Sequence, residues 1–327
     1  MVSILIIVVI IILFTLILNH RKVTFFIKRQ INYFRFIYRA PYNNIPKQYP
    51  LYITNSTIER IGNFGDAIRL GNHIFQINML RYMSKKTGRP FKLIDNWSYN
   101  KYLATPIPVV KLSKEEDYYN YIENNYSDIN INQLPCDKHW NFIGHFEDTK
   151  YIENLDENKE IFKLNPEYQS IVNSKYDSFV RNKKMSIGLH VRRGDFNSLW
   201  FSKRLLPFDY YKRAIYKILS LYPNINMSEF SIIVCSDDIK WCKSMLTREN
   251  LNINCDINYS DLPVDILDMH LLAKCDCQII SNSTFSWWAC ALSDSKIVIN
   301  SADWFKEHWK LLMSPKNSLL MPHWINI

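Results

Sequence analysis

The sequence predicts an α/β fold in which helices cover both faces of a parallel sheet. From about residue 181, short apolar runs alternate with helix-like stretches, and this alternation is typical of strand–helix–strand units. The chain has 327 residues, 47% of them hydrophobic and 14% aromatic, which is enough to build two domain cores. Polar motifs follow several predicted strands. Because such sheets bind ligands at the carboxyl ends of their strands, a ligand site is expected there.

The chain begins with a segment that predicts a membrane anchor. Its first eighteen residues carry no charged side chain and are almost continuously apolar, and Arg21 and Lys22 follow. A cleaved signal peptide would have a basic start and a small-residue cleavage site, which this segment lacks. We therefore predict an uncleaved signal-anchor, a single transmembrane helix at 1–20, followed by a basic stem or linker at 21–50.

The side of the membrane on which the folded part lies is open from the sequence. Basic residues after the span favour a cytoplasmic orientation. N-glycosylation sequons favour a glycoprotein in the lumen of the secretory pathway instead. These sequons lie at Asn55, Asn96, Asn125, Asn226, Asn258 and Asn282.

Charge and cysteine content bear on two other classes of protein. The net charge of +9 would suit an anionic ligand, but the basic residues are scattered and no nucleic-acid-binding motif accompanies them. Nucleic acid is therefore not an expected partner. The seven cysteines have no paired C-x-x-C spacing, so a structural zinc site is not expected.

The part of the chain after the stem divides into two regions by pattern. Residues 51–180 show a turn near 62–65, a helix near 71–86 and a strand near 91–94, and we predict an N-terminal domain there. Residues 181–327 form the predicted C-terminal domain. Its strands are expected near 185–191, 230–235, 277–281 and 296–299, and its helices near 208–222, 239–246, 263–274 and 285–292.

The first strand-end motif runs from His190 to Asp195 and reads His-Val-Arg-Arg-Gly-Asp. The adjacent guanidiniums of Arg192 and Arg193 suit a diphosphate, since arginine is always charged and binds phosphate oxygens as a fork. Gly194 would let the backbone approach such a ligand. An Arg/Asp ion pair at a domain edge would use the same residues, and residue chemistry alone leaves both interpretations open.

The second motif places two carboxylates, Asp237 and Asp238, directly after the strand near 230–235. They could hold a ribose, an acceptor hydroxyl or a metal. They could equally cap the following helix, because Asp side chains accept hydrogen bonds from its first N–H groups. Capping is the favoured role for at least one of them.

The third motif leads from Asp268 to the turn Ser-Asn-Ser-Thr after the strand near 277–281. A helix starts directly after this turn, so Asn282, Ser283 and Thr284 would present N–H groups and hydroxyls to an anion. An ordinary capped helix would explain the polar residues, but not their predicted place on one sheet edge with the arginine pair. The chain contains no Asp-x-Asp pair through which many nucleotide-sugar enzymes hold a metal, so no metal is required.

Taken together, these motifs resemble those of the alpha-1,2-fucosyltransferases, glycosyltransferase family 11. The resemblance rests on 190–195, on 236–243 and above all on 281–288, which reads SNSTFSWW. Upstream, the stretch from Arg69 to Gln76 is similar to the family's Gly-Asn-Gln-x-Phe-Gln signature, and that from Gly144 to Glu147 is similar to a second family segment. The motifs cover about residues 60–300 in the expected order.

The resemblance implies a GT-B architecture, in which two facing Rossmann-like domains hold GDP-fucose mainly through the C-terminal one. It implies inverting transfer of L-fucose from GDP-beta-L-fucose to a glycan hydroxyl, alpha-1,2 to galactose, without a metal or other cofactor. The expected partners are thus GDP-fucose, a glycan acceptor and the membrane. With the family's usual orientation the protein faces the Golgi lumen, whereas the charge bias leaves it facing the cytoplasm.

The resemblance also implies roles for single residues. Arg192 would bind the beta-phosphate, and Arg193 would stabilise the surrounding loop or the leaving group. The acceptor hydroxyl needs a base, for which Asp195 and Asp237 are both candidates. The remaining donor ligands are His190 and Asp268 for guanine, with Asn282, Ser283 and Thr284 at the diphosphate.

An acceptor-side loop is implied at Gly71, Asn72 and Gln76. His73 replaces the usual glutamine of the signature, and this departure bears on the acceptor and the linkage more than on the donor. Two alternatives stay open. One is a glycosyltransferase that uses another nucleotide sugar, and the other is a non-catalytic, membrane-tethered glycan-binding protein.

Overall fold

The structure, a computed structural model, describes residues 53–56, 69–94, 97–110, 118–123, 128–194, 196, 205–302, 319 and 321–327. The predicted anchor at 1–20, the stem at 21–50, the turn near 62–65 and Asp195 lie outside these residues. Within the part that is described, no helix is both long and apolar enough to span a bilayer.

A six-stranded sheet in the second half of the chain confirms the predicted α/β fold. Its strand order is β11-β10-β9-β6-β7-β8, and every neighbouring pair runs parallel. The strands are β6 (Met185–Val191), β7 (Phe230–Ser236), β8 (Asp256–Tyr259), β9 (Cys277–Ile279), β10 (Ile297–Asn300) and β11 (Ile325–Asn326). β9 is shorter than the predicted strand near 277–281, because the Ser283 N–H bonds to the Ser281 carbonyl and starts a turn.

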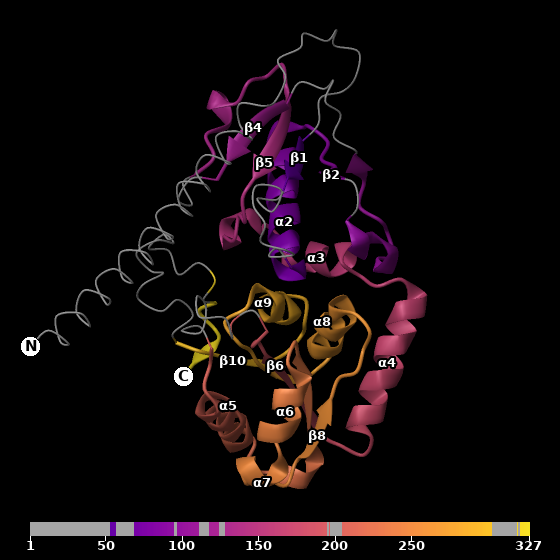
Figure 1. Ribbon diagram of the computed structural model, residues 1–327, viewed down its shortest axis with the longest axis vertical. Helices are drawn as coiled ribbons and strands as arrows, with labels where there is room; N and C mark the ends of the chain where they lie inside the picture. Colours follow the sequence, from indigo (N-terminus) through magenta and orange to yellow (C-terminus); the bar gives the residue numbers. More distant parts are fainter. Residues whose placement is uncertain are drawn as a thin grey trace, which may run out of the picture.

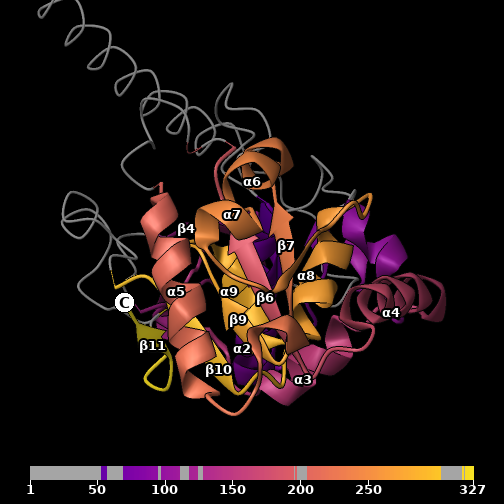
Figure 2. The ribbon, with the colours of Figure 1, turned by 90° about the horizontal axis from the view of Figure 1, so that it is seen from below.

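Helices cover both faces of this sheet (Figure 2), as the buried strands require. Along β6, Ile187, Leu189 and Val191 pack into a core with α5, α6 and α7, whereas α4, α8 and α9 cover the opposite face. The helices are α4 (Pro166–Val180), α5 (Phe208–Leu221), α6 (Ile239–Met245), α7 (Arg248–Leu251), α8 (Asp265–Ala273) and α9 (Thr284–Ala291).

A smaller sheet lies at the other end of the molecule (Figure 1). Its strands run parallel in the order β1-β5-β4, and β2 pairs with β3 beside it. The bounds are β1 (Ile53–Ser56), α2 (Leu70–Thr87), β2 (Leu93–Ile94), η2 (Ser98–Tyr102), β3 (Val109–Val110), β4 (Tyr118–Ile122), β5 (His139–Ile143) and α3 (Leu155–Ile161). Of the predicted strand near 91–94, only the last two residues form a strand, β2. Phe91 makes only an isolated bridge to Ile53.

The two sheets fall on either side of residue 180. Helix α4, which precedes that point, nevertheless packs on the larger sheet. Its Tyr176 hydroxyl lies 2.9 Å from the Ser186 hydroxyl, and its Phe179 carbonyl accepts a 2.7 Å hydrogen bond from Ser231. The division into domains at 51–180 and 181–327 stays a prediction, and by its contacts α4 belongs with the larger sheet.

One continuous apolar core joins the two sheets through α2 and α9. The Phe75 ring of α2 lies 5.1 Å from the Trp287 ring and 5.0 Å from the Trp288 ring, measured between centroids. All three side chains are fully buried. Burial of each stabilises the fold by about 2 to 3 kcal/mol, so α2 is firmly fixed on α9.

Candidate active site

Arg192 and Asp237 meet because the strands that precede them are neighbours. In the pairing of β6 with β7, Val191 lies opposite Ser236, so the next residues leave the sheet side by side. Arg192 Nη1 lies 2.7 Å from Asp237 Oδ2, and the two side chains are 11% and 19% exposed. The ion pair that the motif allowed is therefore present, and it holds Arg192 at the carboxyl end of β6.

Asp237 also fastens the loop that carries the arginine pair. Its Oδ1 accepts the N–H groups of Arg193 at 2.8 Å and Gly194 at 3.0 Å, and its Oδ2 lies 3.5 Å from Arg69 Nη1. Burial alone would raise the pKa of Asp237, but Arg192 and these N–H donors hold it below its usual value. A carboxylate with so many donors suits a positioning role better than the predicted role of base.

Arg193 is held by the second carboxylate of the pair. Its Nε donates to Asp238 Oδ2 at 3.1 Å, and its guanidinium lies 4.1 Å from the centre of the Trp241 ring. Asp238 also accepts the Trp241 N–H at 3.1 Å as the N-cap of α6. The predicted capping role is thus confirmed for Asp238, and Arg193 is fixed on the first turn of α6.

His190 is buried beneath the turn that starts α9. Its Nδ1 lies 2.8 Å from the Ser281 hydroxyl, and its ring packs 4.8 Å from the Phe285 ring. Burial lowers the pKa of His190 to about 3, so the imidazole is neutral at physiological pH. The structure shows His190 supporting the turn, while its part in holding guanine stays a prediction.

Asp268 lies on α8 at the same edge of the sheet. It accepts a short hydrogen bond from the Ser260 hydroxyl, and its carbonyl lies 3.9 Å from Cys235 Sγ. Cys235 is the partner of His190 in the pairing of β6 with β7, so His190 and Asp268 flank it on one face. Burial raises the pKa of Asp268 from 3.8 to about 6.

The turn before α9 packs directly against the start of α2. Ser283 is the N-cap of α9, and the Thr284 hydroxyl donates to Asn72 Oδ1 at 2.5 Å. At Gly71 a β-carbon would lie 2.5 Å from backbone atoms of α9. Asn282 is buried in the same turn. Residues that were predicted for the donor side and residues that were predicted for the acceptor side therefore form one cluster.

Gln76 lies one turn further along α2, beneath the loop that follows β5. Its Nε2 donates to the Gly144 carbonyl at 2.6 Å, and Asn72 Nδ2 lies 3.1 Å from Nδ1 of His145. The three predicted acceptor-side residues thus divide between two tasks. Gly71 faces α9, Gln76 supports the loop at 144–146, and Asn72 contacts both.

Other residues at this cluster were not assigned to a site from the sequence. Arg69 and His145 lie inside the two upstream stretches that resemble the family, and this position is the sequence signal that marks them. Tyr99 of η2 donates to Asp265 Oδ2 of α8 at 2.9 Å, and no sequence signal marks this contact. Among the residues with described positions, no group of three or more His, Cys, Asp or Glu is arranged to hold a metal ion.

Replacing Gly71 by alanine is expected to destabilise the protein strongly. The new methyl group would lie 2.5 Å from backbone atoms of α9, so α2 and α9 would have to separate. We expect the free energy of unfolding to fall by about 3 kcal/mol in urea denaturation. Gly88→Ala is the control, because Gly88 has open space around it and only its φ of 69° opposes a side chain, at about 1 kcal/mol. Equal losses would contradict the steric argument.

Comparisons with known proteins identify relatives of the chain. The family model described as glycosyl transferase family 11 matches residues 67–327. The O-antigen biosynthesis glycosyltransferase WbnK of Escherichia coli is 29% identical over 211 residues, 62% of this chain and 65% of that protein. An alpha-1,2-colitosyltransferase of Escherichia coli is 30% identical over 171 residues, 50% of this chain and 56% of that protein. The chain thus spans less than two thirds of either relative.

A solved structure shares the fold. A mutant of FUT1 from Arabidopsis thaliana, in complex with GDP, matches with a TM-score of 0.53 at 11% sequence identity. The match covers 81% of this chain and 73% of that chain. Since the family model spans every motif of the site and most of the sequence, the chain belongs to glycosyltransferase family 11.

Proposed function

We propose that the protein transfers L-fucose from GDP-beta-L-fucose to a galactose hydroxyl of a glycan, forming an alpha-1,2 linkage with inversion. The observation that carries this proposal is the position of Arg192 and the α9 turn at the carboxyl ends of neighbouring parallel strands, β6 and β9. A diphosphate placed there would meet a guanidinium on one side and helix N–H groups on the other. In the proposed GT-B arrangement, the larger sheet holds the donor and the smaller sheet faces the acceptor.

Arg192 would act by stabilising the departing GDP. Negative charge grows on the beta-phosphate oxygen as its bond to C1 of the sugar breaks. A guanidinium that Asp237 already holds in place needs little reorganisation to meet this charge. Because the Arg192 side chain is only 11% exposed, little water screens the interaction. The proposed chemistry uses no metal or other cofactor.

One relative favours a second donor. The FUT1 structure contains GDP, which supports a GDP-sugar, but the alpha-1,2-colitosyltransferase is named for a different sugar. GDP-colitose is therefore the second candidate donor.

The proposal is tested by incubating the purified chain with GDP-fucose, GDP-colitose and a UDP-sugar in the presence of galactose-terminated acceptors. We expect acceptor-dependent release of GDP from GDP-fucose, and a product whose linkage analysis shows a substituted galactose 2-hydroxyl. Transfer from another donor alone would change the donor assignment. If the protein binds the glycan but neither transfers sugar nor binds GDP, the non-catalytic alternative is favoured.

We propose that the segment 1–20 anchors the protein in a membrane, on the basis of its uncharged, apolar sequence. The sequons give a test of sidedness. Asn226 is exposed, whereas Asn282 is buried and the Asn258 amide donates to Ser231 at 2.9 Å. The chain is expressed in a glycosylating host and Asn226 is examined for a glycan. A glycan at Asn226 supports the luminal orientation, and its absence supports the cytoplasmic alternative.

Binding of GDP is expected to release a proton from Asp268. Near pH 5.5 this carboxyl is mostly protonated, since burial raises its pKa to about 6, whereas guanine N–H groups would favour the anion. Calorimetry in two buffers of different ionisation enthalpy would measure the release, which should approach the protonated fraction of Asp268, about three quarters of a proton per GDP at pH 5.5. Asp268→Asn should abolish the release and weaken GDP binding about 10²-fold, through the loss of charge-assisted hydrogen bonds.

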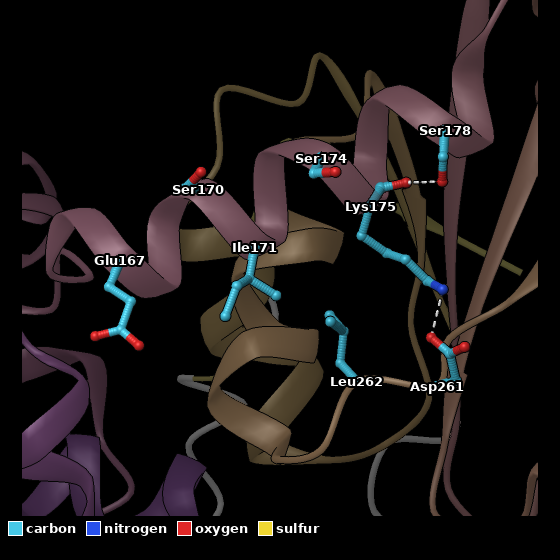
Figure 3. A pocket seen from close by; sticks show the side chains of 8 residues that line it. All are labelled: Glu167, Ser170, Ile171, Ser174, Lys175, Ser178, Asp261 and Leu262. Atoms are coloured by element: carbon cyan, nitrogen blue, oxygen red, sulfur yellow. Dashed lines mark hydrogen bonds and ion pairs between the residues drawn. The ribbon is translucent and has the colours of Figure 1, made fainter.

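The same carboxyl links stability to pH. Because its pKa is raised on folding, its stabilising contribution is complete below pH 3.8 and is lost as pH rises through 6, by about 3 kcal/mol. Asp268→Asn should remove this dependence. Asp294→Asn is the control, since Asp294 is 95% exposed in its ion pair with Lys159. Asp261, whose charge contributes to the raised pKa of Asp268, pairs with Lys175 in a surface groove beside α4 (Figure 3). An unchanged proton release in Asp268→Asn would contradict the assignment.

A further inference from the structure

A chain of hydrogen bonds leads from the α9 turn to a half-buried histidine, His145. The Thr284 hydroxyl donates to Asn72 Oδ1 at 2.5 Å, and Asn72 Nδ2 lies 3.1 Å from His145 Nδ1. The His145 side chain is 40% exposed, so a substrate can reach it. We propose that His145 accepts the proton of the acceptor hydroxyl, an inference that rests on the proposed function. We further propose that donor binding at Thr284 selects the His145 tautomer whose Nε2 is free to accept this proton.

The loop that carries His145 is held in a defined position. Glu123 accepts the N–H groups of His145 at 2.8 Å and Phe146 at 3.0 Å, and Gln76 donates to the Gly144 carbonyl at 2.6 Å. A β-carbon at Gly144 would lie 2.4 Å from the Glu123 β-carbon, so glycine is required for this approach. Phe146 has a φ of 52°, a left-handed conformation that is strained for a residue with a side chain. Strain of this kind persists where the surroundings fix a functional loop.

Without a donor, the hydrogen-bond chain places the ring proton of His145 on the wrong nitrogen for catalysis. The Thr284 hydroxyl has a single proton and gives it to Asn72 Oδ1. Asn72 therefore directs its amide N–H toward His145 Nδ1, which must accept. The neutral ring then carries its proton on Nε2, and its exposed nitrogen is a donor.

A bound diphosphate would reverse the chain. Phosphate oxygens only accept hydrogen bonds, so the Thr284 hydroxyl would turn its proton toward them. Its Oγ1 would then accept from Asn72, whose amide turns over and presents Oδ1 to His145. The histidine must donate from Nδ1, and its Nε2 lone pair becomes available on the acceptor side.

The proton and bond changes of transfer then balance. The acceptor oxygen forms a bond to C1 of the sugar, and the bond from C1 to the beta-phosphate oxygen breaks with its electron pair on GDP. The acceptor proton moves to His145 Nε2, which becomes an imidazolium. Glu147 Oε1 lies 3.8 Å from His145 Nδ1, so a carboxyl group lies beside the positive ring.

Nitrogen NMR of the histidine ring tests the tautomer directly. In the full chain labelled with ¹⁵N-histidine, the His145 signals are assigned from their loss in His145→Asn. We expect protonated Nε2 without nucleotide and protonated Nδ1 with saturating GDP, and no such change in Thr284→Val. If GDP shifts other signals but leaves the His145 tautomer unchanged, the proposed tautomer switch is wrong and the GDP-sugar proposal stands. Absence of every GDP-induced shift would overturn the GDP-sugar proposal with it.

Kinetics test the proton transfer. His145→Asn keeps a polar group near the Nδ1 position but removes Nε2, so kcat should fall about 10³-fold with little change in donor KM. His323→Gln is the control, because His323 is exposed at the far end of the chain. Retained kcat in His145→Asn would overturn the role of His145.

Discussion

Replacement of Arg192 by lysine is expected to lower sugar transfer about 10³-fold while the protein stays folded. A guanidinium can hold Asp237 with one N–H group and a phosphate oxygen with another, whereas an ammonium is a single compact charge that cannot match this fork. Lysine would also lose the contact of the guanidinium with the Phe196 ring, 5.4 Å from its centre. The measurement is kcat with saturating donor and acceptor.

Arg213→Lys is the matched control for this experiment. Arg213 also pairs with an aspartate through a 2.9 Å contact, to Asp209, but both side chains are more than half exposed on α5. An exposed pair of this kind contributes about 0.3 to 0.5 kcal/mol, so transfer and stability should stay close to those of the native protein. Full activity in Arg192→Lys would remove Arg192 from its proposed role at the phosphate.

Replacement of Asp237 by asparagine should affect both stability and transfer. Its Oδ2 would become an NH₂ group facing the guanidiniums of Arg192 and Arg69, so donors would oppose donors. We expect the free energy of unfolding to fall by about 3 kcal/mol and transfer to fall about 10²-fold, because the loop at 192–194 loses its anchor. Urea denaturation and kcat measure the two effects.

The acid dependence of stability supplies a further check on Asp237. Its pKa is lowered on folding, so its contribution is present above the unfolded pKa near 3.8 and is lost as pH falls through the folded value. Asp237→Asn should therefore lose less stability than the native protein between pH 5 and the acid transition. Asp209→Asn, which removes an exposed carboxylate from α5, is the control. An Asp237→Asn profile identical to the native one would contradict the assigned ion pair.

Much of the larger sheet could be predicted because its strands are buried on both faces. Such strands read as continuous apolar runs, and the predicted bounds of β6 agree with the structure. The smaller sheet was harder. Its strand β4 reads Tyr-Tyr-Asn-Tyr-Ile and β5 reads His-Trp-Asn-Phe-Ile, so polar residues interrupt the apolar pattern, and neither strand was predicted.

The sequence predicts residues for the site but not the contacts among them. Motif position brought Arg192 and Asp237 to one sheet edge, yet their ion pair depends on the register of β6 and β7. The contact between Asn72 and Thr284 joins residues 212 positions apart, and no local pattern specifies it. That contact depends on how α2 docks on α9, which is a property of the whole core.

The docking of α2 on α9 limits how this protein can be divided. A chain cut near residue 180 would leave the ring of Phe75 on one piece and those of Trp287 and Trp288 on the other, all exposed to water. The two sheets should therefore melt in one cooperative transition, and isolated halves should aggregate. A chimera that seeks a new acceptor by exchanging the first half would have to retain the native face of α2, or replace α9 together with it.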